Sequence, residues 1–168
     1  MPVFPVMELS AHLAKGARLL GLDLGDKTIG LAVSDPGRTV ASPVDTIRRG
    51  KFTRDAETLI RIIRERAIGG LVIGLPVNMD GTEGPRCQST RQFAANLMEK
   101  LDIPVAFWDE RLSTAAVERF LTDEADMTRK RRSEVVDKLA AAYILQGALD
   151  AMAHAGSAGA THPSTSSG

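Results

Sequence analysis

The sequence has one cysteine, three histidines and no long apolar run. A single thiol, Cys87, cannot form an internal disulfide or a cysteine-rich zinc site. His12, His154 and His162 lie near the ends, which argues against a histidine-based triad or metal site. No segment approaches the ~18 consecutive apolar residues of a membrane span, and the first residues lack the pattern of a signal peptide. We therefore expect a cytoplasmic protein with no membrane partner.

Neither sign of charge is in excess. The chain has 21 basic and 21 acidic residues, and its formal net charge is +0. Bulk charge therefore gives no argument for nucleic-acid binding, and a nucleic-acid surface would have to come from local clustering. With 43% hydrophobic residues, a chain of 168 residues fits one domain with a sizeable core.

The order of apolar patterns predicts an α/β fold with a mixed sheet. The expected strands are 18–35 (two strands joined by a turn), 39–49, 70–76 and 103–110. The expected helices are 52–66, 85–101, 113–122 and 133–150. A leading hairpin followed by alternating helices and strands is typical of a mixed sheet flanked by helices. Sites in such sheets lie where strands end and helices begin, here around positions 23, 76 and 110.

Both ends differ from this pattern. Residues 1–17 are expected to form an N-terminal extension before a domain that spans 18–150. Residues 151–168 are small, polar and rich in Gly and Ser. Such a segment cannot bury enough apolar surface to offset the entropy of ordering, so we expect a disordered tail.

Asp23 is the first candidate site residue, because it lies inside an apolar strand. Charged side chains are rarely buried unless they are paired or bound to a metal. Gly21 and Gly25 flank it on the same face, which leaves open space for a metal or a phosphate backbone. An ion pair with a nearby Lys or Arg is the alternative.

Two further acids follow at element ends. Asp109 and Glu110 come at the end of a strand, where one can face the site and the other can cap the next helix. Asp137 lies at the start of a small, apolar helical stripe; the alternative is an exposed acid that the helix dipole stabilises. Mg²⁺ and Mn²⁺ prefer such carboxylate ligands. Two ions about 3.5–4 Å apart activate water and stabilise the leaving oxygen in phosphodiester hydrolysis. We therefore expect Asp23, Asp137 and one of Asp109 and Glu110 to be catalytic metal ligands.

The remaining motifs concern phosphate. The spacing of Gly21, Gly25 and Gly30 does not form a dinucleotide fingerprint, and the G-D-K-T sequence at 25–28 is not a P-loop. A loop over 76–86 precedes a helix N-terminus, where it could meet a phosphate or serve as a plain connector. The run of Arg129, Lys130, Arg131 and Arg132 could attract a phosphate backbone or remain solvated.

Four blocks of sequence resemble the YqgF family, also called RuvX or Holliday junction resolvase. They are GLDLGDKTIGLAVSD (21–35), VIGLPVNMDGTEGP (72–85), DERLST (109–114) and VDKLAAAYILQ (136–146). The order and spacing of all four blocks make the resemblance specific, and it spans roughly residues 18–150.

The resemblance implies an RNase H-like fold, with a mixed five-stranded sheet flanked by helices. It implies a nuclease that trims the 5′ end of precursor 16S ribosomal RNA, with Asp23, Glu110 and Asp137 as its acids. A Holliday junction resolvase acting on branched DNA remains open, as do ribosomal particles as partners and a monomer or homodimer. Thr28 stands where many members have a basic residue. The expected nucleic-acid contacts are Lys27, Asn78, Arg111 and the basic run 129–132.

Two other function classes fit parts of the sequence. A module that binds nucleic acid or ribosomes without cutting predicts that Asp23→Asn and Glu110→Gln leave its activity in the cell unaffected. An actin-like phosphotransferase also has an Asp-Leu-Gly turn after its first strand. Such proteins usually need a duplicated domain, for which 168 residues leave no room.

Overall fold

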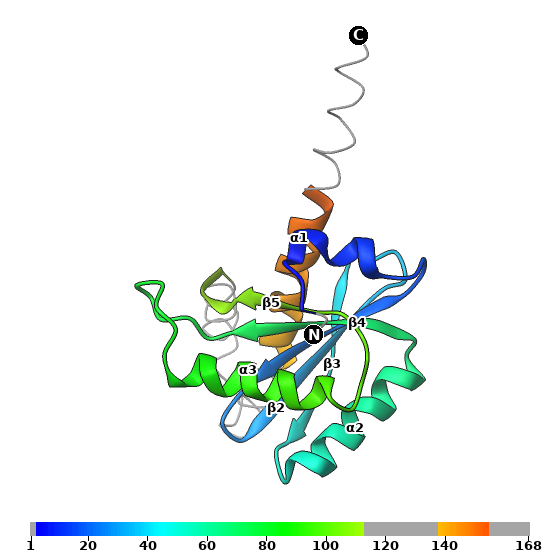
Figure 1. Cartoon of the computed structure of the whole chain (residues 1–168). Coiled ribbons are helices and arrows are strands. Elements are labelled where there is room, and N and C mark those ends of the chain that lie inside the picture. Colours follow the sequence, from blue (N-terminus) through cyan, green and yellow to red (C-terminus); the bar gives the residue numbers. More distant parts are fainter. Residues whose placement is uncertain (1–2, 113–137, 155–168) are drawn as a thin grey trace, which may run out of the picture.

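The computed structural model describes residues 3–112 and 138–154, and its centre is a five-stranded sheet in the order β3-β2-β1-β4-β5 (Figure 1). The strands are β1 (Arg18–Leu24), β2 (Thr28–Ser34), β3 (Ala41–Arg48), β4 (Ile68–Leu75) and β5 (Val105–Asp109). The helices are α1 (Val6–Leu9), α2 (Phe52–Glu65), α3 (Pro85–Met98), the 3₁₀ turns η1 (Ser10–His12) and η2 (Glu110–Leu112), and a C-terminal helix described over 138–154. The predicted α/β class with a mixed five-stranded sheet is confirmed.

Strand direction follows the connections. Short turns join β1 to β2 and β2 to β3, and both pairs are antiparallel. Helices α2 and α3 cross between β3, β4 and β5, and the pairs β1–β4 and β4–β5 are parallel. Crossovers of this length are what parallel strands need. Four strands, β1, β3, β4 and β5, therefore run in the same direction, and only β2 opposes them.

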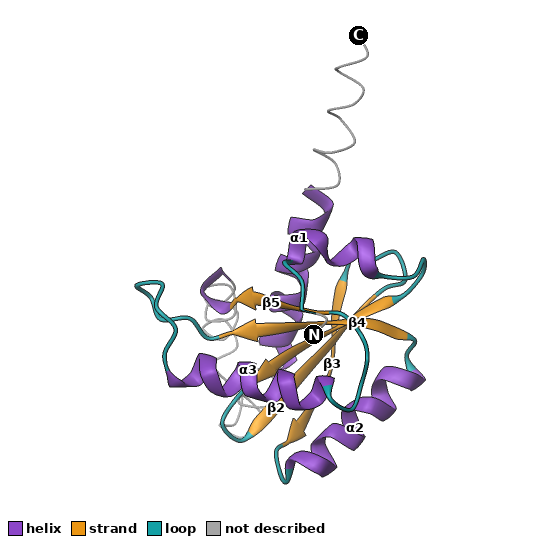
Figure 2. Cartoon of the chain, viewed as in Figure 1, coloured by secondary structure: helices purple, strands orange, loops and turns teal. Residues whose placement is uncertain are grey.

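One face of the sheet packs against α2 and α3 (Figure 2). Alternate residues of the strands, such as Leu22, Leu31 and Ile73, point to this side and are fully buried. They contact Leu59 of α2 and Leu97 of α3 in one apolar cluster. The helical stripes seen in the sequence are therefore the faces that cover this side of the sheet.

The other face packs against α1 and the C-terminal helix. Its strand residues are smaller, and glycines allow a close approach. A Cβ atom on Gly21 would lie 2.8 Å from Cβ of Leu145, and one on Gly147 would lie 2.9 Å from Nε1 of Trp108. Both distances are shorter than ordinary contacts, so the helix and the sheet meet where a side chain is missing.

Both ends of the described chain belong to this second face. Val6 and Leu9, within the expected N-terminal extension, are buried there, and the amide of Phe4 donates a 2.8 Å hydrogen bond to the carbonyl of Val105. The tail predicted from residue 151 is corrected at its start, because the helix continues to 154 and Met152 is buried. The predicted helix 113–122, the start of the predicted helix 133–150 and residues 155–168 lie outside the described residues. Among the described helices, none has the length and apolar character to cross a membrane.

The turn between β2 and β3 is built on Asp35. Its carboxylate accepts hydrogen bonds from the amides of Val40 (2.9 Å) and Thr39 (2.7 Å) and from the Thr39 hydroxyl (2.8 Å). These bonds favour the charged form and lower the pKa of Asp35 from 3.8 to about 2, with the Val40 amide as the largest cause.

We expect Asp35→Asn to make the free energy of unfolding less dependent on pH in the acidic range. A carboxylate with a lowered pKa in the folded state contributes stability above its ordinary pKa of 3.8, and this contribution is lost as the pH falls toward about 2. Urea denaturation from pH 7 to pH 2 should show the wild type more stable at neutral pH and the difference shrinking below about pH 4. A difference that stays constant over this range would contradict the assignment.

Candidate functional site

The carboxyl ends of four strands meet at one edge of the sheet, which we call the carboxyl edge. β1, β3, β4 and β5 end there at Leu24, Arg48, Leu75 and Asp109. In open α/β sheets, ligands bind outside the carboxyl ends of the strands. Both candidate acids that the structure describes, Asp23 and Glu110, lie at this edge.

Asp23 is the second-last residue of β1. Leu22 and Leu24, its neighbours in the chain, point into the cluster under α2 and α3. Strand alternation therefore places Asp23 on the opposite face, with Gly21, toward the C-terminal helix. Asp23 pairs with Gly30 of β2 and is half-buried, whereas the strand residues around it are buried.

Glu110 reaches back from the end of β5 over the neighbouring strand. It is the first residue of η2, and its Oε1 atom lies 2.7 Å from the position that a Cβ on Gly74 would occupy. The same position is 2.5 Å from Cδ1 of Ile144, so Glu110 is on the face of the C-terminal helix. A side chain at position 74 would fill the space that Glu110 uses.

The register of β1 and β4 brings the two acids together. Leu22 pairs with Ile73, and the next residues along these parallel strands are Asp23 and Gly74. Neighbouring strands are about 4.8 Å apart. Because Glu110 lies over Gly74, its carboxylate is beside the strand position of Asp23 and on the same face. Two carboxylates that are far apart in the sequence thus share one side of the carboxyl edge.

The third predicted acid and the basic run are not among the described residues. Asp137 directly precedes the described part of the C-terminal helix, and Arg129, Lys130, Arg131 and Arg132 lie further back in the chain. Within residues 3–112 and 138–154, no group of three or more potential metal ligands is present. The roles of these five residues therefore stay predictions.

The donor set at this edge fits a hard divalent cation. Asp23 and Glu110 offer carboxylate oxygens, and the glycine at position 74 gives the Glu110 carboxylate its place. Mg²⁺ and Mn²⁺ prefer oxygen ligands of this kind over sulfur or imidazole. Cys87, which is buried on the α3 side, does not lie at this position.

Two predicted nucleic-acid contacts are held in local interactions. Arg111 donates from Nε to Oδ2 of Asp109 (2.9 Å) and from Nη1 to the carbonyl of Met79 (3.3 Å). The side-chain bond from Arg111 is the main reason that the pKa of Asp109 is lowered. Asn78 donates from its side-chain amide to Oγ1 of Thr82 (3.0 Å). These bonds stabilise the loop between β4 and α3 and tie it to the end of β5.

Lys27 is exposed in the turn between β1 and β2, next to the carboxyl edge. Its backbone carbonyl accepts a 2.8 Å hydrogen bond from the amide of Arg49. Its position is open to a ligand, and its contact with nucleic acid stays a prediction. Gly74 is a residue that the sequence analysis did not single out; a glycine in the interior of an apolar strand was the available signal.

Comparison with known proteins identifies the family. The sequence profile of the family described as "RuvX: Holliday junction resolvase" matches residues 17–151. The chain belongs to the RuvX family. It is 65% identical over 150 residues to a protein of Paramagnetospirillum magneticum, covering 89% of this chain and 96% of that one. It is 64% identical over 155 residues to a protein of Rhodospirillum centenum, covering 89% and 82%. Both relatives carry the name "Putative pre-16S rRNA nuclease".

Solved structures agree on the fold of this RuvX chain. The yeast mitochondrial Holliday junction resolvase aligns with a TM-score of 0.52 and 11% identity, covering 89% of this chain and 85% of that one. Thermus thermophilus RuvC aligns with a TM-score of 0.50 and 14% identity, covering 82% and 97%. At these identities the likeness shows a shared architecture, and it confirms the expected fold class.

We expect Gly74→Ala to displace Glu110 more than it disturbs the core. The added methyl group would lie within 3.0 Å of Oε1 and Cγ of Glu110 and of Cδ1 of Ile144. Overpacking of this kind costs about 1–3 kcal/mol of stability. The free energy of unfolding should fall by this amount, while the affinity for Mn²⁺, measured by calorimetry, falls more than tenfold. The matched control is Gly37→Ala, in an exposed turn. Unchanged Mn²⁺ affinity in a folded Gly74→Ala protein would contradict the placement of Glu110.

Proposed function

We propose that this RuvX protein is a divalent-metal-dependent nuclease that hydrolyses phosphodiester bonds, with Asp23, Glu110 and Asp137 as its metal ligands. The observation that carries the proposal is the Glu110 carboxylate folded over Gly74 beside the strand position of Asp23. The names of the similar bacterial proteins support precursor 16S rRNA as the substrate. The proposed cleavage is at the 5′ end of that RNA. Such an enzyme acts in the cytoplasm, where it meets ribosomal particles.

The roles of the residues follow from their places. Asp23, Glu110 and Asp137 would hold Mg²⁺ or Mn²⁺, which would supply an activated water and charge stabilisation for the leaving oxygen. Asp23 holds its carboxylate at the end of a strand that is buried on both faces, so the group has little freedom to move. Glu110 lies over Gly74, where both its carboxylate and Ile144 occupy the space that a side chain would fill. Rigid placement of ligands is what lets a site favour the transition state without reorganisation. Asp137, which directly precedes the described part of the C-terminal helix in the chain, would complete the set.

A DNA junction resolvase is the second candidate. The description of the family profile and the shared fold with the yeast resolvase favour it. A resolvase would cut two strands symmetrically as a homodimer, whereas an RNA-processing enzyme can act as a monomer. The two candidates use the same acids and differ in the substrate that crosses the carboxyl edge.

Cleavage by purified protein tests the proposal. Wild type and Glu110→Gln are incubated with precursor 16S RNA and with a four-way DNA junction, each with Mg²⁺, with Mn²⁺ or with EDTA. We expect cleavage only with a divalent ion, and at least a 100-fold lower rate for Glu110→Gln. Substitution of residues that only orient metal ligands already lowers metal affinity or activity about 10–100-fold, and Glu110 is proposed to be a ligand itself.

The matched control is Glu57→Gln, an exposed acid on α2 that should cleave at the wild-type rate. Cleavage in the presence of EDTA, or by folded Glu110→Gln at the wild-type rate, would contradict the metal-dependent assignment. If neither substrate is cut with any ion, the chain acts as a binding module.

A further inference from the structure

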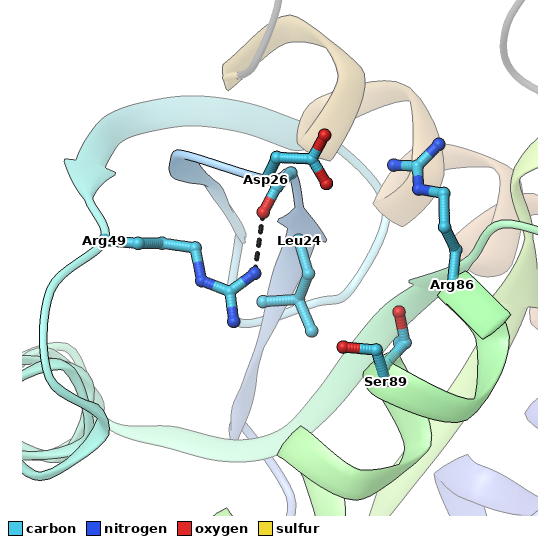
Figure 3. Close-up of a pocket in the computed structure, with 7 residues that line it drawn as sticks. Leu24, Asp26, Arg49, Arg86 and Ser89 are labelled. Carbon is cyan, nitrogen blue, oxygen red and sulfur yellow. Dashed lines mark hydrogen bonds between the residues drawn. The ribbon is translucent and has the colours of Figure 1, made fainter.

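A second feature of the carboxyl edge lies on its other face, between the β1–β2 turn and α3. It is a small pocket lined by Leu24, Gly25, Asp26, Arg49, Arg86, Ser89 and Thr90 (Figure 3). Arg49 comes from the end of β3 and lies on one side, and Arg86 and Ser89 come from α3 on the opposite side. The pocket is small, with a volume of about 40 Å³.

Arg49 is held in place with most of its donors unused. Its Nη1 atom donates a 2.7 Å hydrogen bond to the carbonyl of Gly25, and its guanidinium lies 5.5 Å from the ring centre of Phe93. A guanidinium carries five N–H donors in a planar fork. Only one of them has a partner in the described part of the chain, so the others are available to a ligand in the pocket.

The charge of the lining is positive. Arg49 and Arg86 contribute two cations, and Asp26 is the one acid. Neither arginine forms an ion pair with Asp26 among the described residues, and Arg86 has no hydrogen-bond partner there. Two cations and one anion at one pocket leave a net attraction for an anionic group.

The α3 side of the pocket adds polar groups at helical spacing. Arg86, Ser89 and Thr90 are at positions i, i+3 and i+4, so they share one face of the helix. Thr90 is only 4% exposed and lines the pocket. α3 also begins here without a side-chain cap, and a helix N-terminus favours an anion. The hydroxyls of Ser89 and Thr90 therefore line the pocket beside Arg86, where they can donate to an anion.

The location relates the pocket to the acids. Leu24, which lines the pocket, directly follows Asp23, and the two side chains point to opposite faces of β1. A strand of nucleic acid that crosses the carboxyl edge at Asp23 and Glu110 would therefore pass beside the pocket. Phosphate groups recur at every nucleotide along such a strand.

We propose that this pocket binds one phosphate group of the substrate strand, next to the phosphate that is cut. Arg49 and Arg86 grip its oxygens from two sides, and the hydroxyls of Ser89 and Thr90 donate to it. Because phosphate groups are the same at every nucleotide, this contact fixes the position of the strand and not its sequence. This inference rests on the proposed function, because it takes the substrate to be a nucleic acid.

The test couples one side chain to one phosphate. RNA oligonucleotides that copy the 5′ end of precursor 16S RNA are made with a single phosphate replaced by an uncharged methylphosphonate. Their affinity is measured by fluorescence anisotropy in the Glu110→Gln background, which prevents cleavage. Arg86→Gln is the main variant, because Arg86 is exposed and has no partner whose loss would unfold the chain. Arg64→Gln, an exposed arginine on α2, removes the same charge elsewhere.

We expect one methylphosphonate position to weaken binding about tenfold, the effect of one charge-assisted contact. Arg86→Gln should weaken binding by a similar factor, and the methylphosphonate at that position should then have no further effect. With Arg64→Gln the full effect of that position should remain. Thr90→Val, which keeps the shape and removes the hydroxyl, should weaken binding several-fold and reduce the effect of the same position.

Independent effects of Arg86→Gln and methylphosphonate at every position would overturn the proposal. This result is distinct from failure of the proposed function, which would appear as no cleavage of either substrate by the wild type. A chain that cuts RNA and shows no coupling keeps its nuclease assignment and loses the phosphate pocket.

Discussion

The close contact between the C-terminal helix and the sheet sets the geometry of the candidate site. Gly21, Gly74 and Gly147 all lie where a Cβ would be within about 3 Å of atoms across the interface. Larger side chains there would push the helix away from the sheet. Glu110 and Ile144 both occupy the space over Gly74, so the missing side chain at an apolar interface gives a charged group its position.

The two apolar clusters make this placement rigid. β1 and β4 are covered on both faces, with Leu20 and Leu22 on the side of α2 and α3 and Leu19 and Val72 on the side of the C-terminal helix. Strands buried on both faces are long apolar runs, and a charge such as Asp23 is tolerated only at their exposed end. A carboxylate on such a strand is held in place by the packing of the strand. A metal-binding side chain must be held in this way to be preorganised. The loop between β4 and α3 gains order in another way, through Arg111 and Asp109.

The strands and helices could be predicted from the sequence because their signals are local. Apolar runs such as 70–76 and the helical stripe over 52–66 depend on residues close in the chain. The contact of Glu110 with Gly74 could not be predicted in the same way, because it depends on the register of β4 against β5. The sequence predicted that Arg111 contacts nucleic acid. It could not show that the guanidinium of Arg111 forms a bidentate contact with Asp109. Arg49 and Arg86 were missed since they are far apart in the chain and meet only when α3 packs on the sheet.

The distribution of charge at the carboxyl edge explains how a chain with no net charge could approach a polyanion. Asp23 and Glu110 would repel a phosphate strand, and bound cations offset this repulsion only at the phosphate they contact. On the other face of the same edge, Arg49 and Arg86 are held apart from these acids by the thickness of the sheet. In the proposed function, the face with Asp23 and Glu110 would hold the metal, and the face with Arg49 and Arg86 would attract the phosphate strand.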